Sequence, residues 1–303
     1  MIGRYATPQA FRVALETRLR DIALSRGADL QRLQRRVAFE RLLARFFTQP
    51  DPPWLLKGGY ALELRLEDRA RSTLDLDISV PAPDRLTTEA DSTSCIEAAY
   101  ERLQEAAECD LNDGFEFLIG RPVQMRAGAP QGSIRCHVEA RLAGRVFAKF
   151  HLDVGLGDVV LGQPDWVEGS IRLDFADIPT ARLALYPANQ QFAEKIHAYT
   201  FPWRDRDNTR VKDLVDLVLL AHSGLLDPAN LKRALWATFE ARNTHPLPVR
   251  LPEPPPDWAE PYAALAREIG LPVPTLQEAY ACLDTYWCSW EYANRGRDSP
   301  EWE

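Results

Sequence analysis

Apolar residues recur every three or four positions at the start of the chain, a spacing that predicts two helices. The first helix is expected between Thr7-Pro8, a typical start signal, and Gly27, a typical end. The second begins after Asp29, whose side chain can cap its first turn. The apolar stripes of these two helices are Phe11, Leu15, Leu19 and Ile22, followed by Leu30, Leu33, Val37 and Phe46.

Strand-like alternation follows these helices and gives way to helical spacing near residue 189. The first part is expected to hold helices over 60–66 and 94–107 and strands over 73–80, 115–119, 133–142 and 146–154, with a tight hairpin at Ala143-Gly144. The second part is expected to hold helices over 190–201, 210–222, 228–242, 259–269 and 275–293. The pattern therefore predicts an α+β lobe over residues 1–180 and a helical lobe over residues 181–303.

Composition indicates an ordinary globular protein that is long enough for two lobes. Of its 303 residues, 46% are hydrophobic and 26% charged, and no apolar run approaches the ~18 residues of a membrane helix. The first residues lack the apolar core of a secretion signal, and the five cysteines form no CxxC motif. We therefore expect a cytoplasmic protein with reduced thiols and no membrane partner.

The net charge of −8 argues against a nucleic-acid partner, but the charge is unevenly distributed. The first fifty residues carry ten arginines against four acids, whereas residues 84–117 carry ten acids against two arginines. An RNA could therefore lie along the N-terminal helices, with Arg32, Arg35 and Arg36 as candidate contacts. The net charge thus leaves an RNA partner open.

The candidate chemistry begins with Lys57-Gly58-Gly59 and the motif Arg71-x-Thr73-x-Asp75-x-Asp77. Residues two apart on a strand point to the same face, so Asp75 and Asp77 would lie side by side. The opposite, buried face would hold Leu74, Leu76, Ile78 and Val80. Adjacent carboxylates favour a cation such as Mg²⁺, and the double glycine ahead of a helix suits a phosphate. Each motif alone also fits a solvated strand edge or a plain turn, but their proximity favours a metal site.

A third carboxylate would complete a two-metal site. Asp153 alternates with apolar residues on a strand that could lie beside the strand of Asp75 and Asp77. Asp158 follows two glycines and is expected to be a turn residue. His151 is expected to pack within its strand, with a hydrogen bond near Asp153 as the alternative. Ordinary loop acidity is the alternative explanation for both Asp153 and Asp158.

A second charged cluster lies at the start of the helical region. Lys195 falls on one predicted helix, and the segment from Arg204 to Asp216 brings arginines, Lys212 and Asp213 near the next. A lysine and arginines facing the carboxylates would neutralise a triphosphate in the same cleft. Taken alone, these residues also fit two helices joined by surface salt bridges. His197 is expected to be a partly buried structural histidine.

Together, the double glycine, the Arg-x-Thr-x-Asp-x-Asp motif, the Asp153 strand, Lys195 and the Lys212-Asp213-Leu-x-Asp216 helix resemble the AbiEii/AbiGii nucleotidyltransferase toxin family, which includes the mycobacterial MenT-type toxins. The resemblance runs from Trp54 to Leu220. It implies the DNA polymerase β-like nucleotidyltransferase fold: an α+β lobe with a mixed sheet, followed by a helical C-terminal lobe that completes the active-site cleft. The double glycine is usual in the toxin family, whereas many other nucleotidyltransferases have Gly-Ser.

The resemblance also implies a function. Members of the family act as toxins of toxin–antitoxin systems, each paired with an antitoxin protein. Several transfer a nucleoside monophosphate, often a pyrimidine nucleotide, from an NTP to the 3′ end of tRNA, which blocks aminoacylation. A magnesium-dependent nucleotidyltransferase that releases pyrophosphate and acts on RNA is therefore expected.

The candidate site residues follow from the motifs. By resemblance, Asp75 and Asp77 would hold Mg²⁺, and Asp213 would be a further essential acid. Phosphate contacts by resemblance are Gly58, Gly59, Thr73 and Lys195. The residue patterns add Asp153 as a ligand of one of two metal ions. They also add, as nucleotide contacts, Lys57, Arg71, Arg210 and Lys212. Two alternatives stay open: a non-catalytic protein that binds a nucleotide, and transfer of NMP or phosphate to a protein acceptor.

Overall fold

The computed structural model describes residues 2–49, 51–87, 92–125, 129–203 and 208–294, which form two compact units. We name them the sheet unit, which is Met1–Leu64, Ser72–Asp158 and Pro164–Tyr186, and the helical unit, which is Arg65–Arg71, Val159–Gln163 and Pro187–Glu303. The chain thus passes to the helical unit for good after Tyr186, and two short earlier segments already belong to it.

The two N-terminal helices form where their start and end signals place them. α1 (Pro8–Arg26) begins after Thr7, whose hydroxyl accepts a hydrogen bond from the Ala10 amide, and ends at Gly27 in the left-handed conformation. α2 (Leu30–Phe46) begins after Asp29, whose carboxylate accepts a hydrogen bond from the Arg32 amide. Ile22 was expected in the apolar stripe of α1 but is 37% exposed, because the buried stripe ends one turn earlier.

The described part of the sheet unit holds a mixed sheet in the order β3-β5-β6-β2-β1-β8-β7, with β4 paired to β5. Its strands are β1 (Leu55–Lys57), β2 (Asp75–Val80), β3 (Phe115–Ile119), β4 (Val123–Met125), β5 (Ser133–Leu142), β6 (Arg145–Leu156), β7 (Asp165–Glu168) and β8 (Arg182–Leu185). The pairs β2–β6 and β1–β8 are parallel and the other pairs antiparallel. The predicted α+β class with a mixed sheet is confirmed.

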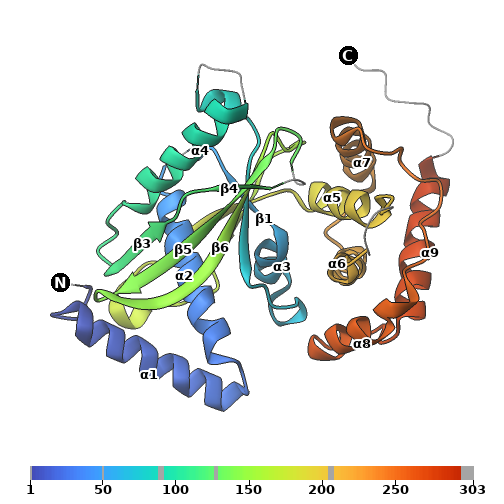
Figure 1. Cartoon of the computed structure of the whole chain (residues 1–303). Coiled ribbons are helices and arrows are strands. Elements are labelled where there is room, and N and C mark those ends of the chain that lie inside the picture. Colours follow the sequence, from blue (N-terminus) through green and yellow to red (C-terminus); the bar gives the residue numbers. More distant parts are fainter. Residues whose placement is uncertain (1, 50, 88–91, 126–128, 204–207, 295–303) are drawn as a thin grey trace. The chain divides into compact units, whose positions relative to one another are not determined.

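The two faces of this sheet differ in polarity. On one face, apolar side chains of β2, β5 and β6 pack against α1, α2 and α4 (Ser92–Ala107) in a single hydrophobic core (Figure 1). Leu76, Ile78 and Val80 are buried there as predicted. Leu74 was expected beside them but is 60% exposed, because β2 begins only at Asp75. The other face carries the polar residues of the same strands, including Asp75 and Asp77.

The hairpin between β5 and β6 turns at Ala143-Gly144, where both residues have positive φ, as the sequence predicts. Next to the turn, Leu142 pairs with Arg145 and Arg141 with Val146, but Ala140 pairs with Ala148. This β-bulge places one extra residue, Phe147, on β6, and it shifts the register of everything beyond it by one position.

The helical unit contains α5 (Ala188–Thr200), α6 (Val211–His222), α7 (Pro228–Arg242), α8 (Ala259–Glu268) and α9 (Leu276–Asn294). α5 packs on α6 and α7, while α6 also packs on α8 and α9 (Figure 1). The proline-rich segment after α7 is fixed by side chains: the Tyr199 hydroxyl donates to the Pro252 carbonyl and the Trp287 indole to the Val249 carbonyl. All five predicted helices of this region are present, with ends that differ by at most two residues.

The five cysteines are all free thiols, and Cys95 and Cys136 are buried. Within the described residues, no helix is long and apolar enough to cross a membrane.

Candidate active site

Three carboxylates occupy neighbouring positions on the polar face of the sheet. β2 and β6 run parallel, and their register sets Asp77 opposite Asp153 and Asp75 opposite His151. Directly opposite residues on paired strands have side chains on the same face, so Asp75, Asp77 and Asp153 form one group, which we name the acid row. The sequence placed Asp153 on a strand that could adjoin the Asp75 strand, and the structure pairs those two strands.

The acid row is open to solvent. The side chains of Asp75 and Asp153 are 38% and 24% exposed. The His151 ring was expected to pack within its strand. Instead its side chain is 47% exposed, and Nδ1 lies 3.4 Å from Asp75 Oδ1. Because residues of β6 alternate between faces, His151 falls on the polar face with Asp153, and the apolar Leu152 takes the core position.

The double glycine begins α3 (Gly58–Leu66) directly beside the acid row. Gly58 has φ +68°, and a Cβ atom there would lie 2.1 Å from Asp77 Oδ2. Both the conformation and the close approach therefore require glycine at this position. The predicted proximity of the double glycine to the Asp-x-Asp motif holds in space, and the N-terminus of α3 adds backbone N–H groups near Asp77.

Thr73 precedes β2, and its hydroxyl donates a hydrogen bond of 3.1 Å to the Asp75 carbonyl. This bond fixes the turn that leads into the acid row. The predicted phosphate contact of Thr73 stays a prediction, since it requires the hydroxyl to exchange this partner.

Lys57 pairs in register with Asp77, but its ammonium group contacts the carboxylate of Asp158. Asp158 was expected to be a turn residue, with ordinary loop acidity as the alternative. It is buried instead, and it also accepts a 2.8 Å hydrogen bond from the Ser79 hydroxyl. A buried carboxylate needs such partners, so Asp158 gives Lys57 a structural contact beside its predicted role toward the nucleotide.

Arg135 is the residue of this site that the sequence patterns did not indicate. It pairs with Asp153 across β5 and β6, and its Nε and Nη2 atoms donate to the two carboxylate oxygens at 2.7 and 2.6 Å. Nη2 also lies 3.6 Å from Asp75 Oδ2. The hydrogen bond to Asp153 and the nearby carboxylates raise the pKa of Arg135 despite its partial burial, so its charge is permanent.

The donor chemistry of the acid row fits a divalent ion that is shared with a substrate. Mg²⁺ binds through one or two carboxylates and takes its other ligands from phosphate and water, so Asp75 and Asp77 would supply the protein's part. Among the described residues, no three histidine, cysteine or acidic side chains are grouped as a ready metal site. Asp153, the predicted further ligand, has both oxygens on Arg135.

The second charged cluster lies inside the helical unit, between α5 and α6. Lys195 is buried, and its ammonium group lies 3.0 Å from Asp213 Oδ1 and 2.7 Å from Asp216 Oδ2. Burial lowers the pKa of Lys195, but the charges of Asp216 and Asp213 outweigh that effect and leave the pKa raised. The ammonium group is therefore charged at neutral pH.

Asp216 is the centre of this cluster, which we name the buried network: Arg71, Lys195, Asp213 and Asp216. Both Asp216 oxygens also accept from Arg71, at 2.9 and 2.7 Å. Burial raises the pKa of Asp216, but Lys195 and Arg71 outweigh it and leave the pKa lowered. From the sequence, Asp213 and Asp216 fall in one helix motif, but only Asp213 was expected to be essential. Arg71, predicted to contact nucleotide, is held in the network by Asp216.

The remaining predicted nucleotide contacts lie at the start of α6. Arg210 Nη1 is 3.5 Å from Asp213 Oδ2, and its guanidinium carbon is 5.5 Å from the centre of the Trp203 ring. Lys212 is exposed. Both are accessible to an anionic ligand, whereas Arg204 and Arg206 of the same segment lie outside the described residues.

Most arginines near the start of the chain form ion pairs with carboxylates of the sheet unit. Arg32 and Arg36 both contact the buried carboxylate of Glu63, at 2.9 and 3.4 Å. Arg41 and Arg45 are buried against Asp113. These internal ion pairs offset much of the local positive charge on which the predicted RNA path along α1 and α2 depends.

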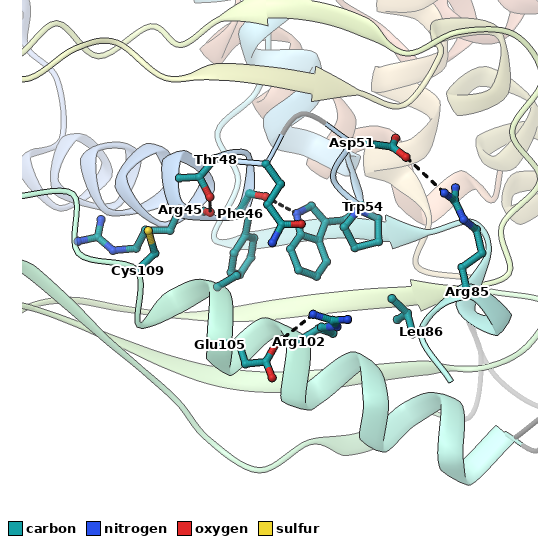
Figure 2. Close-up of a pocket in the computed structure, with 13 residues that line it drawn as sticks. Arg45, Phe46, Thr48, Asp51, Trp54, Arg85, Leu86, Arg102, Glu105 and Cys109 are labelled. Atoms are coloured by element: carbon teal, nitrogen blue, oxygen red, sulfur yellow. Dashed lines mark hydrogen bonds and ion pairs between the residues drawn. The ribbon is translucent and has the colours of Figure 1, made fainter. Parts of the chain in front are cut away.

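A cavity of about 340 Å³ opens between the end of α2 and α4 in the sheet unit. Figure 2 shows Phe46 and Trp54 at its centre, with Arg85 paired to Asp51 and Arg102 to Glu105. No member of the acid row lines it. The acid row therefore lies apart from this cavity, on the open face of the sheet.

Comparisons with known proteins show the family and the fold of the chain. A family model described as nucleotidyl transferase AbiEii toxin, type IV TA system, matches residues 41–284. Among solved structures, the chain is similar to MenT4, a nucleotidyltransferase toxin from Mycobacterium tuberculosis H37Rv, with a TM-score of 0.53 and 19% identity over 93% of this chain and 95% of that chain. At that identity the likeness shows the fold alone. No curated protein matches the sequence.

Proposed function

Because the chain belongs to the AbiEii nucleotidyltransferase toxin family of type IV toxin–antitoxin systems, we propose that it transfers a nucleoside monophosphate from an NTP to an RNA acceptor. The acceptor would be the 3′ end of tRNA, and the reaction would need Mg²⁺ and release pyrophosphate. The observation that carries the proposal is the parallel register of β2 and β6, which gathers Asp75, Asp77 and Asp153 on one open face.

The acid row provides the reaction centre in this proposal. Asp75 and Asp77 would hold Mg²⁺. When bound, the metal would lower the pKa of the attacking 3′-hydroxyl and shield the charge of the leaving pyrophosphate. Gly58 lets the start of α3 approach Asp77, so that backbone N–H groups can meet phosphate oxygens. Asp153 would position the row or join the metal site.

By the family resemblance and the residue patterns, the proposal assigns three cations of the helical unit to the triphosphate. Lys195 and Arg210 would offset phosphate charge, and Lys212 would contribute from the exposed side of α6. Asp213 contacts both Lys195 and Arg210, so it would hold the two cations in position. Asp216 would keep Lys195 charged and fixed, and Arg71 would hold Asp216 in place.

The biological consequence would be a block in translation. A tRNA that carries an extra nucleotide at its 3′ end no longer offers the hydroxyl to which an amino acid is attached. A pyrimidine NTP would be the preferred donor, and a cognate antitoxin protein would restrain the activity in the cell.

The test is to incubate the protein with each α-labelled NTP, Mg²⁺ and total RNA, and to follow the label. We expect label in tRNA, and we expect Asp75→Asn and Asp77→Asn each to reduce its rate by at least about 10³-fold. Asp177→Asn is the matched control, since it neutralises an exposed carboxylate of the same unit that pairs only with Arg4 among the described residues. It should retain wild-type transfer.

Three other outcomes would contradict the proposal in different ways. Label on a polypeptide would assign NMP transfer to a protein acceptor. Label from the γ-phosphate alone would assign phosphate transfer. Tight NTP binding without any transfer would assign a non-catalytic nucleotide-binding role.

A further inference from the structure

Arg135 places a permanent positive charge inside the acid row. Its guanidinium group forms two parallel hydrogen bonds with Asp153, at 2.7 and 2.6 Å, and Nη2 lies 3.6 Å from Asp75 Oδ2. This forked geometry is the strongest kind of arginine–carboxylate contact. The side chain is 35% exposed, so the fork is not sealed into the core and can leave Asp153 without opening the fold.

A cation at this position has a clear electrostatic cause. Three carboxylates on adjacent strands repel one another unless positive charge lies among them. His151 approaches Asp75 at 3.4 Å but carries charge only when protonated. Arg135 therefore supplies the fixed charge that balances Asp153 and part of Asp75.

We propose that Arg135 is a built-in counter-ion that competes with the divalent metal for the acid row, so that Asp153 can ligate a metal only after the guanidinium group leaves it. The proposal rests on the proposed function, because that function brings the metal to this site. It goes further by stating that the protein without nucleotide binds metal weakly, and that one residue sets this weakness.

Ordinary electrostatics explains both why Arg135 opposes a metal ion and what can draw Arg135 away from Asp153. The guanidinium group repels a divalent ion a few ångströms away, and it withholds both oxygens of Asp153 from coordination. Phosphate is an equally suitable partner for the fork, so a triphosphate at the row offers Arg135 a new contact. Metal and nucleotide binding would then support each other through Arg135.

The test is direct titration of the full chain with Mn²⁺, which replaces Mg²⁺ and is detected by electron paramagnetic resonance, without nucleotide. Arg135→Gln should bind Mn²⁺ at least about tenfold more tightly than the wild type, since it removes one charge next to the site. Arg135→Lys keeps the charge but loses the fork, and its affinity should fall between the two. Arg141→Gln is the matched control: it lies on the same strand and face, pairs with Glu139 at 2.7 Å, and should leave the affinity unchanged.

Thermal unfolding gives a second readout that does not depend on catalysis. In EDTA, Arg135→Gln should unfold at a lower temperature than the wild type because the acid row is left uncompensated. Mn²⁺ should restore the variant by more degrees than it adds to the wild type. Equal or weaker Mn²⁺ affinity in Arg135→Gln would overturn the proposal and would make Arg135 a support for Asp153 only.

The results separate this inference from the proposed function. If Arg135→Gln tightens Mn²⁺ binding but no NTP labels any RNA, the counter-ion role stands and the proposed function fails. If Asp75→Asn abolishes labelling while Arg135→Gln leaves Mn²⁺ affinity unchanged, the proposed function stands and the counter-ion role fails.

Discussion

The acid row and the buried network use the same kinds of side chain in opposite ways. In the sheet unit, Asp75 and Asp153 are 38% and 24% exposed, and both lie against Arg135, which is itself 35% exposed. In the helical unit, Asp216 and Lys195 are 1% and 11% exposed, and two cations share Asp216. Ion pairs that are open to solvent can exchange partners, whereas ion pairs closed off from solvent cannot. We therefore expect changes in the network to affect the fold first and changes in the row to affect chemistry first.

The largest expected effect on stability is that of Asp216→Asn. The substitution leaves Lys195 and Arg71 buried without their shared carboxylate, so the free energy of unfolding should fall by about 3–5 kcal/mol. Asp153→Asn, in the open row, should change it by less than about 1 kcal/mol. Urea unfolding followed by circular dichroism measures both. Equal losses for the two variants would remove the distinction between row and network.

A smaller effect is expected for Gly58→Ala, which changes the sheet unit at the point where α3 meets Asp77. The new Cβ would overlap the Asp77 carboxylate and hold an unfavourable positive φ, at a combined cost of roughly 2–3 kcal/mol. Gly144→Ala is the control, because Gly144 has φ +71° with no atom within 4 Å of its Cβ position. It should cost only about 1–2 kcal/mol. The same loss in both variants would show that Asp77 does not constrain Gly58.

The smallest effect is a pH dependence that belongs to the helical unit. Burial, aided by the charges of His245 and Arg242, lowers the pKa of His197 to about 3. The folded protein therefore holds His197 neutral, while the unfolded chain takes up a proton below its ordinary pKa of about 6.5. This contribution to stability is complete above pH 6.5 and is lost progressively toward pH 3, by about 2 kcal/mol at pH 5.

Urea unfolding at pH 7 and pH 5 measures this loss, and His197→Gln should flatten it. His222→Gln, on α6, is the matched control and should keep the wild-type dependence. A wild-type protein that is equally stable at pH 7 and pH 5 would contradict the assignment.

The sequence indicated the elements well where periodicity was long. The predicted helix over 228–242 and the predicted strands over 115–119 and 133–142 match the structure residue for residue. β1 and β4 have three residues each, and β7 and β8 have four, so they are too short for a two-residue period to stand out. β1 matters most among them, because it is the strand that leads into Gly58.

The contacts of the site were less predictable than its residues. Asp75, Asp77 and Asp153 could be named from alternation, but Asp158 follows two glycines, and only the fold shows that Lys57 and Ser79 meet it. Asp216 could have been singled out because a carboxylate amid α6's buried residues needs cations. The partner of Arg135 could not be read from the sequence, because it depends on the register of the β5–β6 hairpin. Counting back from the turn without a bulge puts Arg135 opposite Leu152, not Asp153.

The single bulge residue at Phe147 therefore fixes the parity of the β5–β6 hairpin. If Phe147 paired one to one instead of forming the bulge, Arg135 would stand opposite Leu152, and one strand's polar residues would turn toward the core. Loss of Phe147 itself would leave Arg135 opposite Asp153, because regular pairing from the turn then gives the same partners. A single residue lost or gained elsewhere between the two would keep them opposite only if the bulge changed with it.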